Sequence, residues 1–420
     1  MILMSIILVF LAIVGAPLFA VIATSAMLGF YREDTDLMNM ALEIQGIGDL
    51  PFLAAIPLFT FAGYLLSESE APKRLVRITR AFLGWMPGGL ALVSLAACAF
   101  FTAFTGASGV TIIALGAILY PALKHDGYPD KFNLGLITSS GSLGLLFAPS
   151  LPLILYGVIA EVSIDSLFLA GIMPGLVMLA MLSVWSLWVN RANRKPVATF
   201  SWNAAGAAIR ESIWELPLPF VVLGGIYSGY LAVSEAAAVT ALYVLIVEVL
   251  IHREIPLRKL PGIMRSSMVL VGGILIILGV SLASTNYMIG AGIPQMLLEY
   301  VADLVTSPVS FLILLLVFLL VLGAILDIFS AIVLVVPLIL PIAAQYGVHE
   351  VHLGIVFLAA MQLGYMTPPV GLNLFIASYR FEKPIMHVYS ATFPFLIILM
   401  LSVILIAFWP GLSLWLVPGS

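Results

Sequence analysis

Charged residues are scarce in this sequence: Asp, Glu, Lys and Arg together make up 9% of its 420 residues. Soluble globular proteins carry about 25% charged residues, so a soluble fold is excluded. Hydrophobic residues account for 62% of the chain, and its mean hydropathy is +1.18. We therefore expect most of the chain to lie in a lipid bilayer, with no nucleic acid as a partner.

Cysteine is nearly absent as well. Cys98 is the single cysteine, which excludes an intrachain disulfide and metal sites built from thiolate pairs. The sequence also lacks a nucleophile with a base, a His-rich metal motif and a phosphate-binding loop, so we expect no enzymatic activity. The histidines fall in predicted loops and are expected at the surface; they are His125, His252, His349, His352 and His387.

Lys and Arg are missing from two long stretches, residues 132–190 and 266–379. Elsewhere they form clusters, and assigning these clusters to the cytoplasm leaves Arg32 alone, of 17 basic residues, on the other side. This topology places the N-terminus inside and the C-terminus outside. An anion held at mid-depth must then be bound by backbone dipoles and neutral side chains.

Two parts of the chain repeat one pattern of a polar, glycine-rich tip followed by a proline-interrupted hydrophobic segment. The first tip is Thr105–Gly109 and the first break Ala148–Pro152; the second tip is Gly323–Asp327 and the second break Thr367–Asn373. Interrupted hydrophobic segments at matching places in two halves indicate a transporter whose substrate and ion sites lie between broken helices.

We accordingly predict an all-α polytopic membrane protein built as an inverted repeat, with two re-entrant hairpins and two broken transmembrane helices. Residues 1–215 form the first repeat, with a span at 2–30, a hairpin at 88–123, a broken helix at 132–160 and a span at 167–189. Residues 216–420 contain a linking span at 216–229 and the second repeat, with a span at 232–251, a hairpin at 309–342, a broken helix at 353–378 and a span at 389–416. The charge clusters require opposite orientations for the two repeats.

The tips and breaks offer two kinds of ligand. Carbonyls freed by prolines, together with hydroxyl groups, are hard oxygen ligands suited to sodium, and half-helix N-termini attract an anionic carboxylate. Asp327 is the acid that stands out, because a carboxylate in an apolar run is by default a functional hypothesis. Asp is also a good helix N-cap, and the same residue could serve both purposes. Glu235 is equally open to a capping or a functional interpretation.

At these residues the sequence resembles the large membrane subunit of tripartite ATP-independent periplasmic (TRAP) transporters. The resemblance rests on the first tip, on APSLPLILYG at 148–157, on GGIYSGYLAVSEAAAV at 224–239 and on MTPPVGLNLF at 366–375. It implies a sodium-driven, elevator-type importer of the ion transporter superfamily, located in a bacterial inner membrane. The substrate would be an organic anion, such as a dicarboxylate, another carboxylic acid or a sialic acid.

The resemblance also implies roles for individual residues, with more than one sodium ion bound. One sodium site would involve Thr105, Gly106, Ser108, Ser140 and Pro149. A second would involve Asp327, Thr367 and Gly371. Substrate contacts would come from Ser108, Ser150 and Asn373.

The partners implied are a small four-helix membrane subunit, expected as a separate chain, and a periplasmic solute-binding protein that delivers the substrate. Both hairpins and both broken helices would form a mobile transport domain, and the remaining helices a scaffold. Alternatives are an autonomous sodium/dicarboxylate symporter or ion antiporter of related architecture, a membrane-embedded enzyme and a purely structural subunit. Uptake by this chain without a binding protein would favour the autonomous carrier.

Overall fold

The computed structural model describes residues 7–418 except 9, 12–15, 33, 51–52, 87, 192–199, 294, 297–298, 300–304 and 306. Within this described part every regular element is a helix and no residue is in a strand. Six described helices are long and apolar enough to cross a membrane, or eight if each of two bent helix pairs counts as one span. The all-α, multi-span fold expected from the composition is therefore confirmed.

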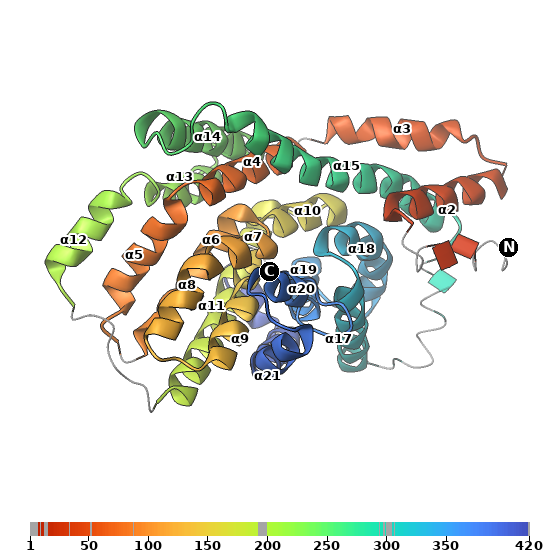
Figure 1. The fold of residues 1–420 in the computed structure, drawn as a ribbon. Coiled ribbons are helices and arrows are strands. Elements are labelled where there is room, and N and C mark those ends of the chain that lie inside the picture. The colour runs from red at the N-terminus through yellow and green to blue at the C-terminus, as the bar shows by residue number, and fades with distance from the viewer. Residues whose placement is uncertain are drawn as a thin grey trace.

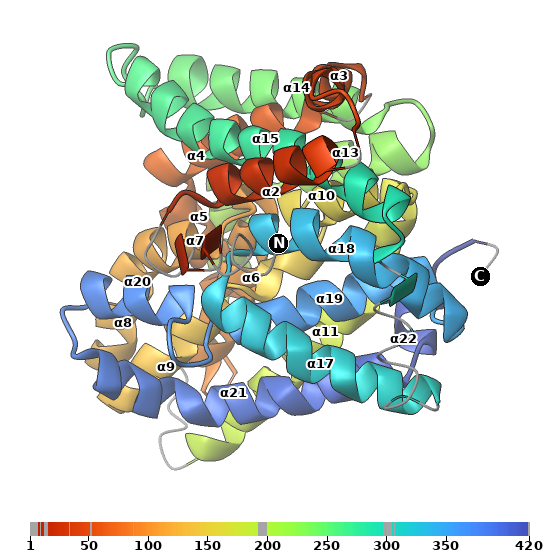
Figure 2. The ribbon, with the colours of Figure 1, turned by 90° about the vertical axis from the view of Figure 1, so that its right-hand side faces the viewer.

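The helices form two layers in space (Figures 1 and 2). One layer is drawn across the top of both views. It contains α2 (Leu18–Arg32), α3 (Met38–Gly46), α4 (Ala55–Glu68), α13 (Pro217–Tyr227), α14 (Val233–Leu245) with its continuation η3 (Ile246–Ile251), and α15 (Leu260–Gly290).

The second layer is larger and lies beneath the first (Figure 1). From the first half it takes α6 (Gly89–Thr105), α7 (Ser108–Ala114), α8 (Gly116–His125), α9 (Asp130–Ser140), η2 (Leu143–Leu146), α10 (Leu151–Ala160) and α11 (Ile164–Val189). From the second half it takes α17 (Pro308–Ile325), α18 (Ile328–Gln345), α19 (Glu350–Gly364), α20 (Leu372–Arg380), α21 (Ile385–Phe408) and α22 (Gly411–Leu414).

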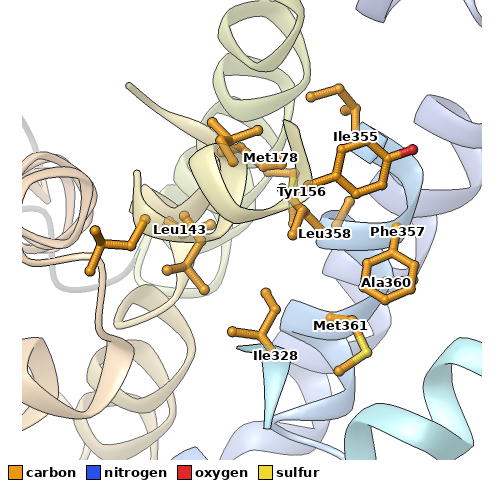
Figure 3. Packing of buried hydrophobic residues seen from close by; sticks show 14 of the residues in the cluster. Leu143, Tyr156, Met178, Ile328, Ile355, Phe357, Leu358, Ala360 and Met361 are labelled. Atoms are coloured by element: carbon orange, nitrogen blue, oxygen red, sulfur yellow. The ribbon is translucent and has the colours of Figure 1, made fainter. Parts of the chain in front are cut away.

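The core of this second layer is almost entirely apolar (Figure 3). Tyr156 of α10, Met178 of α11 and Leu358 of α19 meet there, so elements from both halves share one core. Helix α19 is enclosed on nearly every side, with residues 351–366 all buried. Most of its side chains are accordingly apolar, and the exceptions among its buried residues are His352 and Gln362.

Both predicted hairpins and both predicted breaks coincide with interruptions of helix. The segment 88–123 folds as α6, α7 and α8, with a bend of 49° between α7 and α8, and 309–342 folds as α17 and α18. The segment 132–160 bends by 43° before α10, and 353–378 divides into α19 and α20. The predicted spans at 167–189 and 389–416 correspond to α11 and to α21 with α22.

Two predicted spans need comment. The segment 216–229 corresponds to α13, whose 11 residues extend about 16 Å, roughly half the hydrocarbon thickness of a bilayer. Helix α13 is therefore too short to cross alone. The span predicted at 2–30 corresponds to α2, and its residues 2–6, 9 and 12–15 lie outside the described part of the chain.

A charged cluster ties the flanking helix α5 (Ala71–Leu83) to the upper layer. Arg74 bonds Glu215 through Nε at 2.6 Å, Glu248 of η3 through Nη2 at 3.3 Å, and Glu254 through Nη1. Burial alone would raise the pKa of Glu254, but hydrogen bonds from Arg74 and from the Glu70 N–H hold it below its usual value. The stabilisation it gives is present at neutral pH and is lost as the pH falls through that lowered pKa.

The structure shows the hydrogen-bond partners of two polar residues, Glu235 and His352, whose surroundings the sequence did not determine. Glu235 accepts a hydrogen bond from the Ala232 N–H at 2.9 Å and so caps the start of α14. The expectation that every histidine is at the surface is wrong for His352, which is 2% exposed inside α19. Its ring nitrogens lie 3.1 Å from Ser413 Oγ and 3.2 Å from the Ala407 carbonyl, which explains its burial.

Candidate functional site at the tips and breaks

The first tip reverses the chain between α6 and α7. Gly106 adopts φ +63°, a left-handed conformation that glycine takes without steric cost. A Cβ added at Gly106 would lie 2.6 Å from Leu151 Cγ, so this tip packs tightly on the beginning of α10. Thr105 is 1% exposed, and its Oγ1 has no hydrogen-bond partner among the described residues.

The first break separates α9 and η2 from α10. The Ala148–Pro149 peptide is cis, and Ser150 occupies the N-cap position of α10 without making a side-chain cap. Ser150 is fully buried, and within the described part of the chain its Oγ also lacks a partner. Ser140 is buried as well, but its Oγ bonds the Ile137 carbonyl of its own helix at 3.3 Å.

The second tip is organised by its acid. Asp327 is the N-cap of α18 and accepts hydrogen bonds from the N–H groups of Phe329 and Ser330, both at 3.0 Å, and from the Ser330 hydroxyl. The capping interpretation of Asp327 is confirmed by this geometry. The residue is nevertheless exposed at the surface of the described chain.

The second break packs directly on the second tip. Gly371, with φ +55°, donates its N–H to the Ala324 carbonyl at 3.1 Å, and the Tyr365 hydroxyl accepts from the Ile328 N–H at 2.6 Å. The Pro368–Pro369 peptide is cis. Thr367 is half-buried and bonds the Leu363 carbonyl of α19 at 2.9 Å.

Asn373 joins the two halves. It is fully buried, its Oδ1 accepts a hydrogen bond from Ser108 Oγ of the first tip at 2.7 Å, and its Nδ2 lies 3.5 Å from the Thr138 carbonyl of α9. The first tip also touches the end of α9, because a Cβ at Gly141 would lie 3.3 Å from the Ser108 carbonyl. Of the predicted substrate contacts, Ser108 and Asn373 are thus in direct contact, and Ser150 lies beside the first tip through Leu151.

The segments that form the tips and breaks carry no basic side chain; Arg380, at the end of α20, reaches α7, where its Nε donates to the Ile113 carbonyl at 3.2 Å. The sequence between Lys131 and Arg191 and between Arg265 and Arg380 contains no Lys or Arg. The N-termini of α10 and α18 begin at the first break and the second tip, and each carries partial positive charge. Neutral oxygen donors and helix dipoles together can hold a hard cation and a carboxylate.

The donor set present fits sodium better than a transition metal. Among the described residues no group of three His, Cys, Asp or Glu side chains is placed to hold a metal ion. The oxygens of Thr105 and Ser150 are buried without partners, and a buried polar atom needs one. Hydroxyl and carbonyl oxygens of this kind suit a hard monovalent cation.

Two features of the region were missed from the sequence. Thr102 of α6 bonds Thr111 of α7 at 2.7 Å and the Gly141 carbonyl at 2.9 Å. No local sequence pattern predicts these two hydrogen bonds. Gln362 of α19 is 1% exposed, and neither atom of its amide has a hydrogen-bond partner in the described structure. Gln362 could have been noticed, because it is an isolated amide in the apolar run Leu353–Leu363.

Comparisons with known proteins agree on the type of protein. The family model described as "Tripartite ATP-independent periplasmic transporter, DctM component" matches residues 1–412. The chain is 31% identical to the C4-dicarboxylate TRAP transporter large permease protein DctM of Pseudomonas aeruginosa over 90% of this chain and 88% of that protein. It is also 31% identical to the ectoine TRAP transporter large permease protein TeaC of Halomonas elongata, over 97% and 96%.

A solved structure shares the fold. The crystal structure of the Alcanivorax borkumensis YdaH transporter, reported to have an unusual topology, superimposes with a TM-score of 0.64. The match covers 90% of this chain and 89% of that chain at 13% sequence identity, so it bears on the fold alone.

Proposed function

Because this chain belongs to the DctM component family of the tripartite ATP-independent periplasmic transporters, we propose that it imports a small organic anion in symport with sodium. The substrate class is a C4-dicarboxylate or another small carboxylate, with sialic acid included. The observation that carries this proposal is the neutral, buried set of donors at the tips and breaks, in a region whose sequence has no Lys or Arg.

Sodium coupling rests on the chemistry of the donors. The first site would use Thr105, Gly106, Ser108, Ser140 and Pro149. The second would use Asp327, Thr367 and Gly371. A sodium ion beside the first tip would add a full positive charge where the tip and break side chains carry none, and so would favour binding of the anion next to it.

The two layers support an elevator mechanism. The hairpins and broken helices all belong to the lower layer, and the upper layer contacts them mainly through α4 and α15 (Figure 2). In the proposal the lower layer carries the cargo across the membrane while the upper layer, held to α5 by Arg74, stays fixed. A small membrane subunit would bind the fixed layer, and a periplasmic binding protein would deliver the substrate.

The test is uptake into proteoliposomes that contain this chain, its small membrane subunit and the matching binding protein. A panel of labelled succinate, ectoine and sialic acid is offered under an inward sodium gradient and under an equal potassium gradient. We expect accumulation of at least one compound that requires both sodium and the binding protein. Equal uptake in potassium would refute sodium coupling, and uptake without the binding protein would identify an autonomous carrier instead.

A further inference from the structure

Gln362 occupies a position where an apolar side chain would be expected. It lies in α19, three residues after Ala359 and two before the helix ends at Gly364, and it is 1% exposed. Neither its Nε2 nor its Oε1 has a hydrogen-bond partner within the described part of the chain. An unsatisfied buried amide destabilises the fold, and methionine or leucine would avoid this cost. The fold alone therefore gives no reason for a glutamine here.

The helical repeat shows which face of α19 carries Gln362. Residues 355, 358 and 362 lie on one stripe, because side chains three and four positions apart share a face. Ile355 and Leu358 lie beside Tyr156 of α10 and close to Met178 of α11 (Figure 3). Gln362 continues this stripe by one turn toward the second break, so it belongs to the face that α19 turns to the first half.

On that face the neighbouring helix runs in the opposite direction. The Tyr156 hydroxyl donates to the Glu350 carbonyl at 2.8 Å, and a Cβ at Gly354 would meet the Tyr156 ring, so the beginning of α19 lies beside Tyr156. Helix α19 also packs on η2, which precedes α10 in the chain. The end of α19 lies near the beginning of α10, because the Asn373 N–H bonds the Tyr365 carbonyl at 3.1 Å while the Asn373 side chain bonds Ser108 of the first tip, which packs on Leu151. The two helices are therefore antiparallel.

The antiparallel arrangement brings Gln362 to the depth of Ser150. From Gly354 to Gln362 the helix advances by about 12 Å, and from Tyr156 back to Ser150 by about 9 Å. Ser150 begins α10, is fully buried, and its Oγ has no partner among the residues described. Two buried, unpartnered polar side chains thus lie at similar depth on facing broken helices, one from each half.

We propose that Gln362 is a substrate-binding residue: its amide N–H group and the Ser150 hydroxyl hold one carboxylate group of the transported anion between α19 and α10. This inference rests on the proposed function. An amide N–H and a hydroxyl can each donate to one oxygen of a carboxylate, and the N-terminus of the ten-residue helix α10 adds positive potential at the same place. Hydrogen bonds to a charged group are stronger than neutral ones, which gives the buried amide its function.

The test compares Gln362→Met with wild type in the proteoliposome assay, using whichever of succinate, ectoine and sialic acid the wild-type complex accumulates. Met has nearly the volume of Gln but no donor. We expect the KM for the anion to rise about tenfold, the loss of one hydrogen bond to a charged group. The sodium concentration for half-maximal uptake stays the same. The thermal midpoint of the purified variant stays equal or rises, because an unsatisfied amide has been removed.

Two further variants complete the test. Gln362→Glu keeps the side-chain size but places a carboxylate next to the carboxylate of the substrate. The two negative charges repel each other, so we expect uptake to be lost. Leu358→Met, one turn earlier on the same stripe, is the matched control and should transport as wild type does. A wild-type KM for Gln362→Met, a shift in sodium dependence alone, or a fall in its thermal midpoint that parallels the loss of uptake would each overturn the inference. Failure of the wild-type complex to transport any anion would instead count against the proposed function.

Discussion

The two tip-and-break regions have the same plan, but they differ in burial and in how their polar groups are satisfied. In the first region Thr105, Ser108 and Ser150 are all buried, and two of their three hydroxyls lack partners among the described residues. In the second region Asp327 is exposed and Thr367 half-buried, and both side chains already have hydrogen-bond partners. Buried hydroxyls without partners therefore occur in the first region, whereas the carboxylate belongs to the second.

This difference changes how the acid should be understood. Isolated carboxylates attract attention in membrane sequences because their burial is costly. The hydrogen bonds that Asp327 accepts at the start of α18 satisfy its carboxylate and reduce that cost. Neutral groups such as Ser150 and Gln362 are harder to recognise from sequence. Their polar atoms are buried and have no hydrogen-bond partner among the described residues, so a hydrogen bond to a ligand would stabilise them more.

The largest effect is expected at Asn373, where the two regions join. Asn373→Leu leaves the Ser108 hydroxyl without its acceptor in a buried setting, so we expect uptake to fall more than about tenfold and stability to fall by about 1–3 kcal/mol. Sodium-driven uptake and thermal unfolding measure the two losses. In the double variant with Ser108→Ala the losses should be clearly less than additive, because both changes remove one interaction. Strict additivity would show that the contact carries no coupling.

Glycine replacement tests whether the second break is conformationally constrained, with a glycine inside a helix as the control. Gly371→Ala places a Cβ 3.0 Å from the Thr367 and Tyr365 carbonyls at φ +55°, and we expect destabilisation of about 1–2 kcal/mol. Gly206→Ala in α12 (Trp202–Glu211) meets open space and should stabilise by about 0.5–1 kcal/mol. Thermal unfolding in detergent distinguishes them. Equal shifts for the two variants would mean that the second break is not conformationally constrained.

A smaller effect is expected at Asp327, where two replacements separate its roles. Asp327→Asn keeps a good N-cap but removes the charge, whereas Asp327→Ala removes both, at a cost of about 1 kcal/mol in stability. If the charge serves a sodium site, both variants need more sodium for half-maximal uptake. Normal sodium dependence in Asp327→Asn would restrict this residue to capping.

The positions of the tips and breaks were accessible from sequence because their signals are local. Gly106 and Gly371 interrupt helices where the chain adopts positive φ, and the prolines at 149 and 368 mark the ends of hydrophobic segments. Asp327 could also be assigned as a cap, since Asp before an apolar helix is a strong local pattern.

The partners of these residues could not be predicted, because they depend on distant parts of the chain. Ser108 and Asn373 are 265 positions apart, and no pattern in either segment indicates their contact. His352 was misplaced for the same reason: its burial depends on Ser413 and the Ala407 carbonyl. The role of Gln362 could not be predicted because it depends on which residues its side chain faces. The antiparallel packing of α10 and α19 determines those residues.

The most direct test of this account compares two serines that differ mainly in location. Ser150 and Ser186 are both fully buried, and the hydroxyl of each has no partner in the described part of the chain, but Ser186 lies in α11, away from both breaks. Neither change to Ala breaks a hydrogen bond, so both variants should keep the wild-type thermal midpoint. We predict that Ser150→Ala raises the KM for the transported anion about tenfold, whereas Ser186→Ala leaves it unchanged. Identical uptake kinetics in the two variants would contradict the assignment of the anion site to the tips and breaks.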